Sequence, residues 1–242
     1  MAKLRVHNIE SGPASSDVAF GISGDTIAVS SDSLKLNTWK DSGGNTLFQS
    51  DGAGTLSNVN SSFSGAGPKL ILSQTADASS SISFTSGIDN TYDKYRFVCV
   101  NMHPNSNSIV FLFNGSTDGG SNYNAVKTTT FFNAHHQEDD GDAALNYRAG
   151  NDLAQSADPQ YLTSSIGNGS DESASGILDI YSPSSTTYVK QFTAHFTVYR
   201  STDEIWDCFI AGYMNTTSAV DAIQFTVDSG TFDGIIKMYG VD

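Results

Sequence analysis

Ten segments of the chain after residue 68 have the hydrophobic pattern of extended strands, and in several of them hydrophobic and polar residues alternate. Phe192, Ala194 and Phe196 fall on one side of an extended strand, and the residues between them are polar. Residues 97–100 and 109–113 are instead apolar throughout, which is typical of central strands. Turn residues separate the segments, and no helical period lies between them. The pattern predicts strands at residues 69–73, 81–85, 94–101, 108–114, 125–133, 176–181, 189–199, 205–213, 222–228 and 232–239.

Strands with one apolar and one polar face need a second layer to cover the apolar side. Many short strands joined by turns, with few helix-forming runs, favour two packed antiparallel sheets, and the jelly roll is a common closed arrangement at this size. We therefore predict an all-β protein. In this prediction, residues 69–242 form an antiparallel, jelly-roll-like β-sandwich, and residues 1–68 form an extended N-terminal region of short strands.

Residues 1–68 have only scattered apolar residues between clusters of Ser, Gly, Asp and Asn. These residues are too few to form a hydrophobic core within one chain. The region is therefore expected to be stable when several chains wind together or when it lies on a neighbouring subunit. Disorder is the alternative interpretation. Trp39 and the pair Leu47 and Phe48 argue against complete disorder, because large apolar groups are usually buried. At Gly67 and Pro68 the sequence changes from scattered apolar residues to longer apolar, strand-like segments, and we place the predicted domain boundary there.

The net charge of −14, from 12 Lys and Arg against 26 Asp and Glu, argues against nucleic acid as a partner. No apolar stretch approaches the roughly 18 residues of a membrane span, so no membrane insertion is expected. The first ten residues contain no apolar core of a secretion signal, so we expect synthesis in a cytoplasm without secretion by the usual signal route. Cys99 and Cys208 lie in apolar segments and are predicted to be reduced thiols in the core.

Residues 135–169 break the strand pattern and are predicted to form a long contact loop. Adjacent histidines point to opposite sides of a strand, so His135 and His136 are not expected to share a zinc ion. Carboxylates from Asp139 to Asp142 give a possible Ca²⁺ turn, with a solvated acidic loop as the alternative. Aromatic side chains in the loop suit stacking on the sugar rings of a surface glycan, or they anchor the loop. The candidate contact residues are His135, His136, Asp139, Asp140, Tyr147 and Tyr161.

The sequence contains neither the Gly-x-Ser-x-Gly motif of a nucleophilic serine nor a Gly-x-x-x-x-Gly-Lys phosphate loop. We therefore predict that the protein is not an enzyme and carries no cofactor. Paired carboxylates for glycoside hydrolysis need only meet in space, so a glycan hydrolase stays open as a third alternative.

Three motifs give the chain a resemblance to a known family. They are Thr91-Tyr-Asp-Lys-Tyr-Arg-Phe followed by Asn101-Met-His-Pro, then Ser116-Thr-Asp-Gly-Gly, and finally Gly230-Thr-Phe-Asp-Gly-Ile-Ile-Lys-Met-Tyr-Gly. Over residues 70–242 the chain resembles a domain of tail-fibre-like and other virion proteins of tailed bacteriophages. Its start, with the segment from Asn37 to Phe48, is similar to the leaders of marine phage structural proteins. Residues 105–107 depart from the family pattern by forming a polar turn, so no binding site is carried over there.

The resemblance implies a β-sandwich in a homo-oligomer, most often a trimer, located in the virion. The first expectation is a tail fibre or spike subunit whose residues 1–68 attach to other virion proteins while the sandwich contacts the host surface. The alternative is a capsid decoration or cement protein, in which the N-terminal strands run across neighbouring subunits. Copy number per particle distinguishes the two.

Overall fold

The computed structural model describes residues 38–41, 43–50, 53, 56, 57, 59 and 67–242. The chain divides into two compact units, Met1–Gly65 and Ala66–Asp242, and each is described by itself. The expected attachment role of residues 1–68 falls largely outside the described residues. In the part of the chain that is described, no helix is long and apolar enough to cross a membrane.

The described part of the first unit is a small antiparallel sheet of β1 (Thr38–Lys40), β2 (Thr46–Ser50) and β3 (Leu56–Ser57). Trp39 pairs with Phe48 across β1 and β2, and their ring centroids lie 5.6 Å apart. The β1–β2 turn is closed by Asp41, whose Oδ1 accepts hydrogen bonds from the backbone N–H groups of Gly43 and Asn45 at 2.8 Å each. The short strands expected in this region are thus present here.

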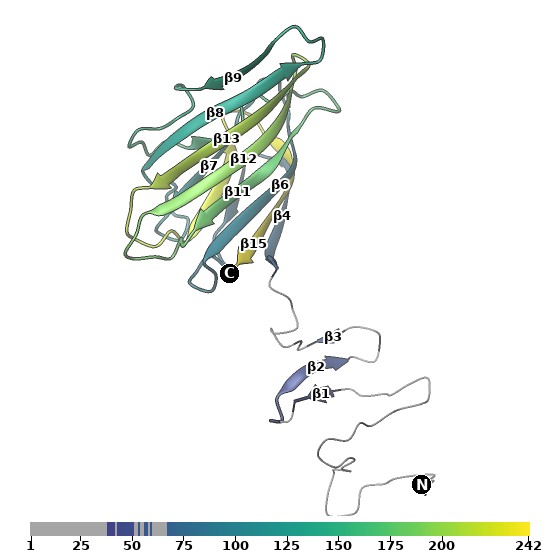
Figure 1. Cartoon of the computed structure of the whole chain (residues 1–242), viewed down its shortest axis with the longest axis vertical. Coiled ribbons are helices and arrows are strands. Elements are labelled where there is room, and N and C mark those ends of the chain that lie inside the picture. Colours follow the sequence, from purple (N-terminus) through teal and green to yellow (C-terminus); the bar gives the residue numbers. More distant parts are fainter. Residues whose placement is uncertain (1–37, 42, 51–52, 54–55, 58, 60–66) are drawn as a thin grey trace, which may run out of the picture. The chain divides into compact units, whose positions relative to one another are not determined.

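The second unit is an antiparallel sandwich of an eight-stranded and a four-stranded sheet, which confirms the predicted fold class (Figure 1). The large sheet has the order β4-β15-β6-β11-β12-β13-β8-β9, and the small sheet has the order β10-β7-β14-β5. The strands are β4 (Lys69–Ser79), β5 (Ser81–Phe84), β6 (Lys94–Pro104), β7 (Phe111–Ser116), β8 (Lys127–Gln137), β9 (Ala143–Tyr147), β10 (Gln160–Tyr161), β11 (Ala174–Tyr181), β12 (Lys190–Arg200), β13 (Glu204–Met214), β14 (Ala222–Val227) and β15 (Phe232–Val241).

All ten predicted strands are present, but the prediction of one long loop over residues 135–169 is wrong. β8 continues to Gln137, and the chain then turns back as β9, which pairs with β8 at the edge of the large sheet. β10 adds two residues to the edge of the small sheet. The pattern missed β9 because an edge strand has no need of a buried face, and its side chains are mostly exposed.

Phenylalanine rings from both sheets fill the core. Phe111 in the small sheet packs at centroid distances of 5.6 Å from Phe225, 5.4 Å from Phe232 and 6.1 Å from Phe196. All six residues of β7 are buried, as expected for its apolar part, residues 111–113; the polar Asn114 and Ser116 are buried with them. Because these rings join the two layers, the sheets are fixed rigidly against one another, and the solvent side of the large sheet becomes a stable platform.

Cys99 and Cys208 are both free and buried. Burial raises the pKa of the Cys208 thiol to about 12 and raises the pKa of Cys99 well above its usual range. We expect Ellman's reagent to label neither thiol at pH 8 in the native protein and to label both in denaturant. Rapid labelling of the native protein would contradict the packing described for β6 and β13.

Candidate functional site

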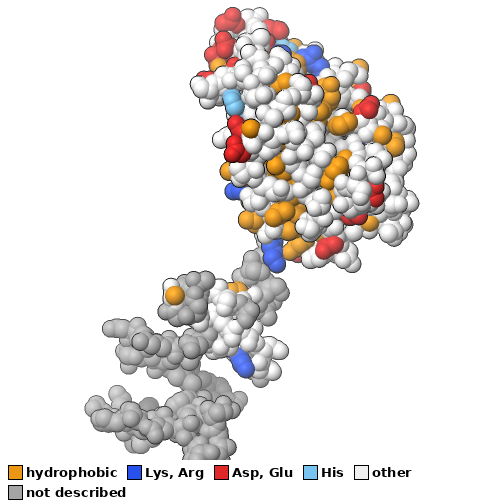
Figure 2. Space-filling view, turned by 180° about the vertical axis from the view of Figure 1, so that it is seen from behind, with side chains coloured by type: hydrophobic (Ala, Val, Ile, Leu, Met, Phe, Trp, Pro, Cys, Tyr) orange, Lys and Arg blue, Asp and Glu red, His pale blue; other side chains and the backbone are white. Residues whose placement is uncertain are grey.

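The candidate site lies on the outer face, defined as the side of the large sheet that points away from the small sheet. Alternate residues of each strand reach it, such as Gln191, Thr193 and His195 on β12, which are exposed, whereas Phe192 and Ala194 are buried. Figure 1 is viewed onto this sheet, and β11, β12, β13 and β8 run side by side across its middle. On the opposite side, Figure 2 shows acidic side chains gathered at the end that carries the β8–β9 turn.

A ladder of large side chains crosses the outer face in direct register. Phe132, Phe209 and His195 are consecutive partners on β8, β13 and β12. The centroids of the Phe132 and Phe209 rings are 5.1 Å apart, and those of Phe209 and His195 are 4.4 Å apart, with nearly parallel planes in both pairs. Tyr147 on β9 extends the row at one end, and Ile177 on β11 extends it at the other. An aromatic row on solvent-facing positions of a sheet is typical of an interaction surface.

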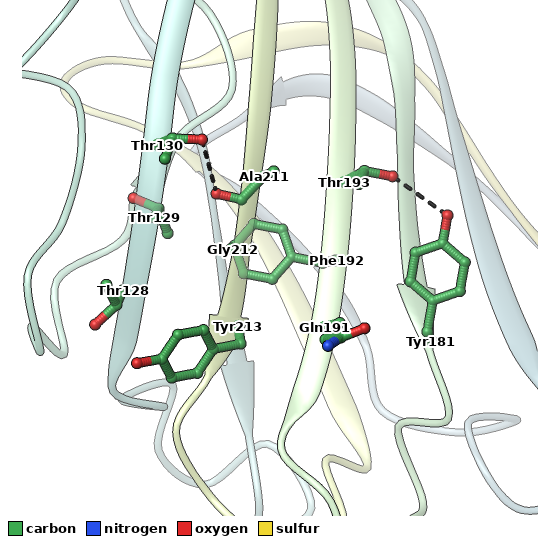
Figure 3. A pocket seen from close by; sticks show the side chains of 10 residues that line it. All are labelled: Thr128, Thr129, Thr130, Tyr181, Gln191, Phe192, Thr193, Ala211, Gly212 and Tyr213. Atoms are coloured by element: carbon green, nitrogen blue, oxygen red, sulfur yellow. Dashed lines mark hydrogen bonds between the residues drawn. The ribbon is translucent and has the colours of Figure 1, made fainter.

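Two adjoining hollows lie over this part of the sheet and share Thr193 and Ala211; together they are called the groove. The first hollow has a volume of about 410 Å³ and is shown in Figure 3. The second has a volume of about 290 Å³ and is bounded by the aromatic ladder. The first is lined by Thr128, Thr129, Thr130, Tyr181, Gln191, Phe192, Thr193, Ala211, Gly212 and Tyr213, and the second by Phe132, Ile177, Thr193, Ala194, His195, Phe209, Ile210 and Ala211.

The groove exists because β13 carries two small residues between large ones. Ala211 points outward between Thr130 and Thr193, its register partners on the neighbouring strands, and is too small to fill the space. A β-carbon at Gly212 would lie 2.6 Å from Thr129 Cγ2 and 2.7 Å from the Thr128 carbonyl oxygen, so glycine allows close strand packing there. The floor of the groove is therefore set by the sequence and not by a mobile side chain.

Hydroxyl and amide groups line the first hollow. The Thr130 hydroxyl donates to the Ala211 carbonyl at 3.4 Å, and the hydroxyls of Tyr181 and Thr193 lie 3.4 Å apart (Figure 3). Tyr213 Oη accepts a long hydrogen bond of 3.4 Å from Gln155 Nε2. These bonds are at the weak end of the range, so the groups keep capacity to bond a ligand.

Charges at the rim of the groove are compensated by partners within the protein. His195 Nε2 and Asp207 Oδ1 are 2.5 Å apart. Asp179, which pairs with Thr193 in register, accepts two hydrogen bonds of 2.7 Å from Arg96. No Lys, Arg, Asp or Glu side chain lines either hollow, and His195 is the single histidine among the lining residues. The groove is thus close to neutral in a chain with a net charge of −14.

The two histidines predicted for a contact loop lie on β8 and separate as expected for neighbours on a strand. The His135 side chain is 7% exposed and stacks on Trp206 at 5.3 Å, whereas the His136 side chain is 53% exposed. Trp206 is also contacted by the guanidinium groups of Arg148 at 4.4 Å and Arg200 at 4.6 Å. His135 therefore belongs to a structural cluster at the end of the sheet, and a loop position is wrong for both histidines.

Trp206 donates its indole N–H to Glu204 at 2.6 Å. Burial alone would raise the pKa of Glu204, but hydrogen bonds from Trp206, Gln137 and Arg200 lower this pKa to about 2. The carboxylate is therefore ionised and fully engaged within the fold, and it stabilises the end of the large sheet.

The acidic residues of the β8–β9 turn bond within the turn and to the histidines. Asp139 Oδ1 accepts the Gly141 N–H at 2.9 Å, Asp140 lies 3.2 Å from His136 Nε2, and Asp142 lies 3.1 Å from His135 Nε2. Among the described residues, no three metal-ligating side chains come together. The Ca²⁺ turn stays a prediction.

The two loop tyrosines are on strands, which corrects their predicted position. Tyr147 is 58% exposed on β9 and belongs to the end of the aromatic ladder, whereas Tyr161 on β10 packs partly against the core. The six predicted contact residues therefore do not form one site. The groove residues were missed because they occupy ordinary polar positions of strands, and the one signal was the small pair Ala211 and Gly212 inside an aromatic strand.

Comparison of the chain with protein-family models, with curated proteins and with solved structures finds no match.

Proposed function

We propose that the chain is a non-enzymatic structural subunit of a bacteriophage particle, a tail fibre or spike protein, whose outer face contacts the host surface. The observation that carries the proposal is the aromatic ladder with its adjoining groove, held on solvent-facing positions of a rigid sheet. Within residues 67–242, no element covers it. Sites built on strands keep their geometry, which suits repeated recognition without chemistry.

The residues that resemble virion proteins support this proposal through their place in the fold. Tyr95 and Phe97, in the first motif, are buried on β6, and Met238, in the closing motif, is buried on the adjacent β15. The Ser-Thr-Asp-Gly-Gly motif forms the turn after β7, where Gly119 and Gly120 have positive φ angles of 70° and 86°. Asp118 holds that turn by accepting from the Asn122 N–H at 2.9 Å. The buried residues of these motifs thus stabilise the sandwich that carries the outer face.

In this proposal residues 1–68 attach the chain to other virion proteins and help to assemble a homotrimer. Three sandwiches on one fibre present three outer faces, so weak individual contacts combine into stable attachment through a high effective concentration. A face of modest affinity is then sufficient for host recognition.

Gold-labelled antibodies against the sandwich are expected to mark the tail of the particle. Purified full-length protein in excess is expected to compete with particles for adsorption and to lower the adsorption rate severalfold. Labelling spread over the capsid with hundreds of copies per particle would favour a decoration protein. Unlabelled particles together with unchanged adsorption would contradict a role in the virion.

A further inference from the structure

The chemistry of the groove restricts which ligands it can bind. An anionic ligand needs uncompensated cations, and a cationic ligand needs free carboxylates. Neither hollow is lined by a Lys, Arg, Asp or Glu side chain. The nearby Asp179 is engaged by Arg96 and Lys94. Asp207 is engaged by His195. Charge complementarity therefore favours an uncharged ligand, and it disfavours phosphate, nucleic acid and acidic peptides.

Two tyrosines stand on either side of Gln191 in the first hollow (Figure 3). Among the described residues, no aromatic ring packs on Tyr213, and Tyr181 has only the Lys94 ammonium group near its ring, at 5.8 Å from the centroid. The rings of Phe132, Phe209 and His195 instead cover one another by stacking. Tyr213 is partly buried, and among the aromatic rings that line the groove it is the one on which no described ring or cation packs.

Amide and hydroxyl groups line the hollow beside the Tyr213 ring, and they can hydrogen-bond a ligand that carries many hydroxyls. No described residue hydrogen-bonds the side-chain amide of Gln191, which offers two donors and an acceptor and is exposed. Two threonines on the strands that flank β13 add hydroxyl groups. Thr193 is on β12, the strand of Gln191, and Thr130 is on β8. A sugar ring has an apolar C–H face and a polar rim, so it matches an aromatic surface bordered by amide and hydroxyl groups.

We propose that the groove binds a neutral oligosaccharide of a cell-surface polysaccharide, with one sugar ring on Tyr213 and its hydroxyls bonded to Gln191 and Thr193. The second hollow continues the groove past Ala211 toward the aromatic ladder and takes the next sugar unit. This inference rests on the proposed function, because host contact through the outer face is what places a glycan there. It names the ligand class and the residues that recognise it.

The test measures binding of the full-length protein to short oligosaccharides of hexoses and N-acetylhexosamines by saturation-transfer NMR and calorimetry, with sialylated and phosphorylated oligosaccharides as charged counterparts. Tyr213→Ala removes the platform, and Ala211→Trp fills the groove from an exposed position without disturbing the core. Each is expected to weaken binding of a neutral ligand about tenfold or more. Tyr239→Ala is the matched control, because Tyr239 is a partly exposed tyrosine of the same sheet on β15, three strands from Thr193.

Unchanged affinity in both groove variants, binding of the charged oligosaccharides alone, or absence of binding to the neutral set would each overturn the proposal. A shift of oligomeric state in Ala211→Trp would also overturn it, because a second copy would then occupy the groove. Adsorption competition distinguishes failure of the glycan site from failure of the virion role. If Ala211→Trp still competes with particles for adsorption, the glycan site is rejected and host contact stands. If the groove binds sugar but the protein is absent from the particle, the glycan site stands and the virion role is rejected.

Discussion

Replacing Phe111 with alanine is expected to lower the free energy of unfolding by about 3–5 kcal/mol, the largest effect of any single change considered for this protein. The ring is fully buried and contacts Phe225 in its own sheet and Phe196 and Phe232 in the other. Its removal leaves a cavity between the layers that the rigid sheets cannot collapse to fill. Urea unfolding followed by tryptophan fluorescence measures the change.

Phe132→Ala is the matched control, because it deletes the same side chain from the outer face. Phe132 is 40% exposed and stacks on Phe209 alone among the described rings, so its loss should cost about 1 kcal/mol. Equal destabilisation by the two variants would show that the sandwich core is not where the structure places it.

The stability of the protein is expected to rise between pH 7 and about 10 through Lys127, an effect that Lys127→Met abolishes. Lys127 is completely buried, and its Nζ donates to Asn114 Oδ1 at 2.5 Å and to the Ala125 carbonyl at 2.6 Å. Burial lowers its pKa from 10.5 to about 7, although Asp158 opposes the change. Between these values the unfolded chain binds the proton more tightly than the folded chain does, so raising the pH favours folding.

The measurable quantity is the difference in free energy of unfolding between the wild type and Lys127→Met. It should increase in favour of the wild type by about 2 kcal/mol from pH 7.5 to pH 9.5, since each unit in this interval contributes up to about 1.4 kcal/mol. Lys69→Met is the matched control, because it makes the same substitution at an exposed lysine. Parallel stability curves for the wild type and Lys127→Met would mean that the buried amine stays protonated throughout.

The sequence was sufficient to predict the strands that build the core, because burial on one face imposes a period of two residues on each of them. The alternation from Phe192 to Val198 correctly predicted a strand with one buried face, and the apolar run 109–113 correctly predicted a strand that is buried on both faces. The division into eight and four strands could not be predicted, since strand order depends on pairing between segments far apart in the chain.

The candidate site could not be predicted for a different reason. His135 and Tyr147 were assigned to a loop because the segment around them is polar, yet both are on strands at the edge of the large sheet. Groove residues such as Thr193 and Tyr213 look like ordinary solvent-facing positions in the sequence. Only the register of β8, β12 and β13 brings them together around Ala211.

A cryo-electron microscopy map of the intact particle, at a resolution that separates β-strands, tests the virion role most directly. We expect the sandwich at the outer end of a tail fibre or spike, with β12 and β13 facing solvent and the groove beside Tyr213 open. A map in which another subunit covers that sheet face, or in which the sandwich lies inside the particle, would contradict it.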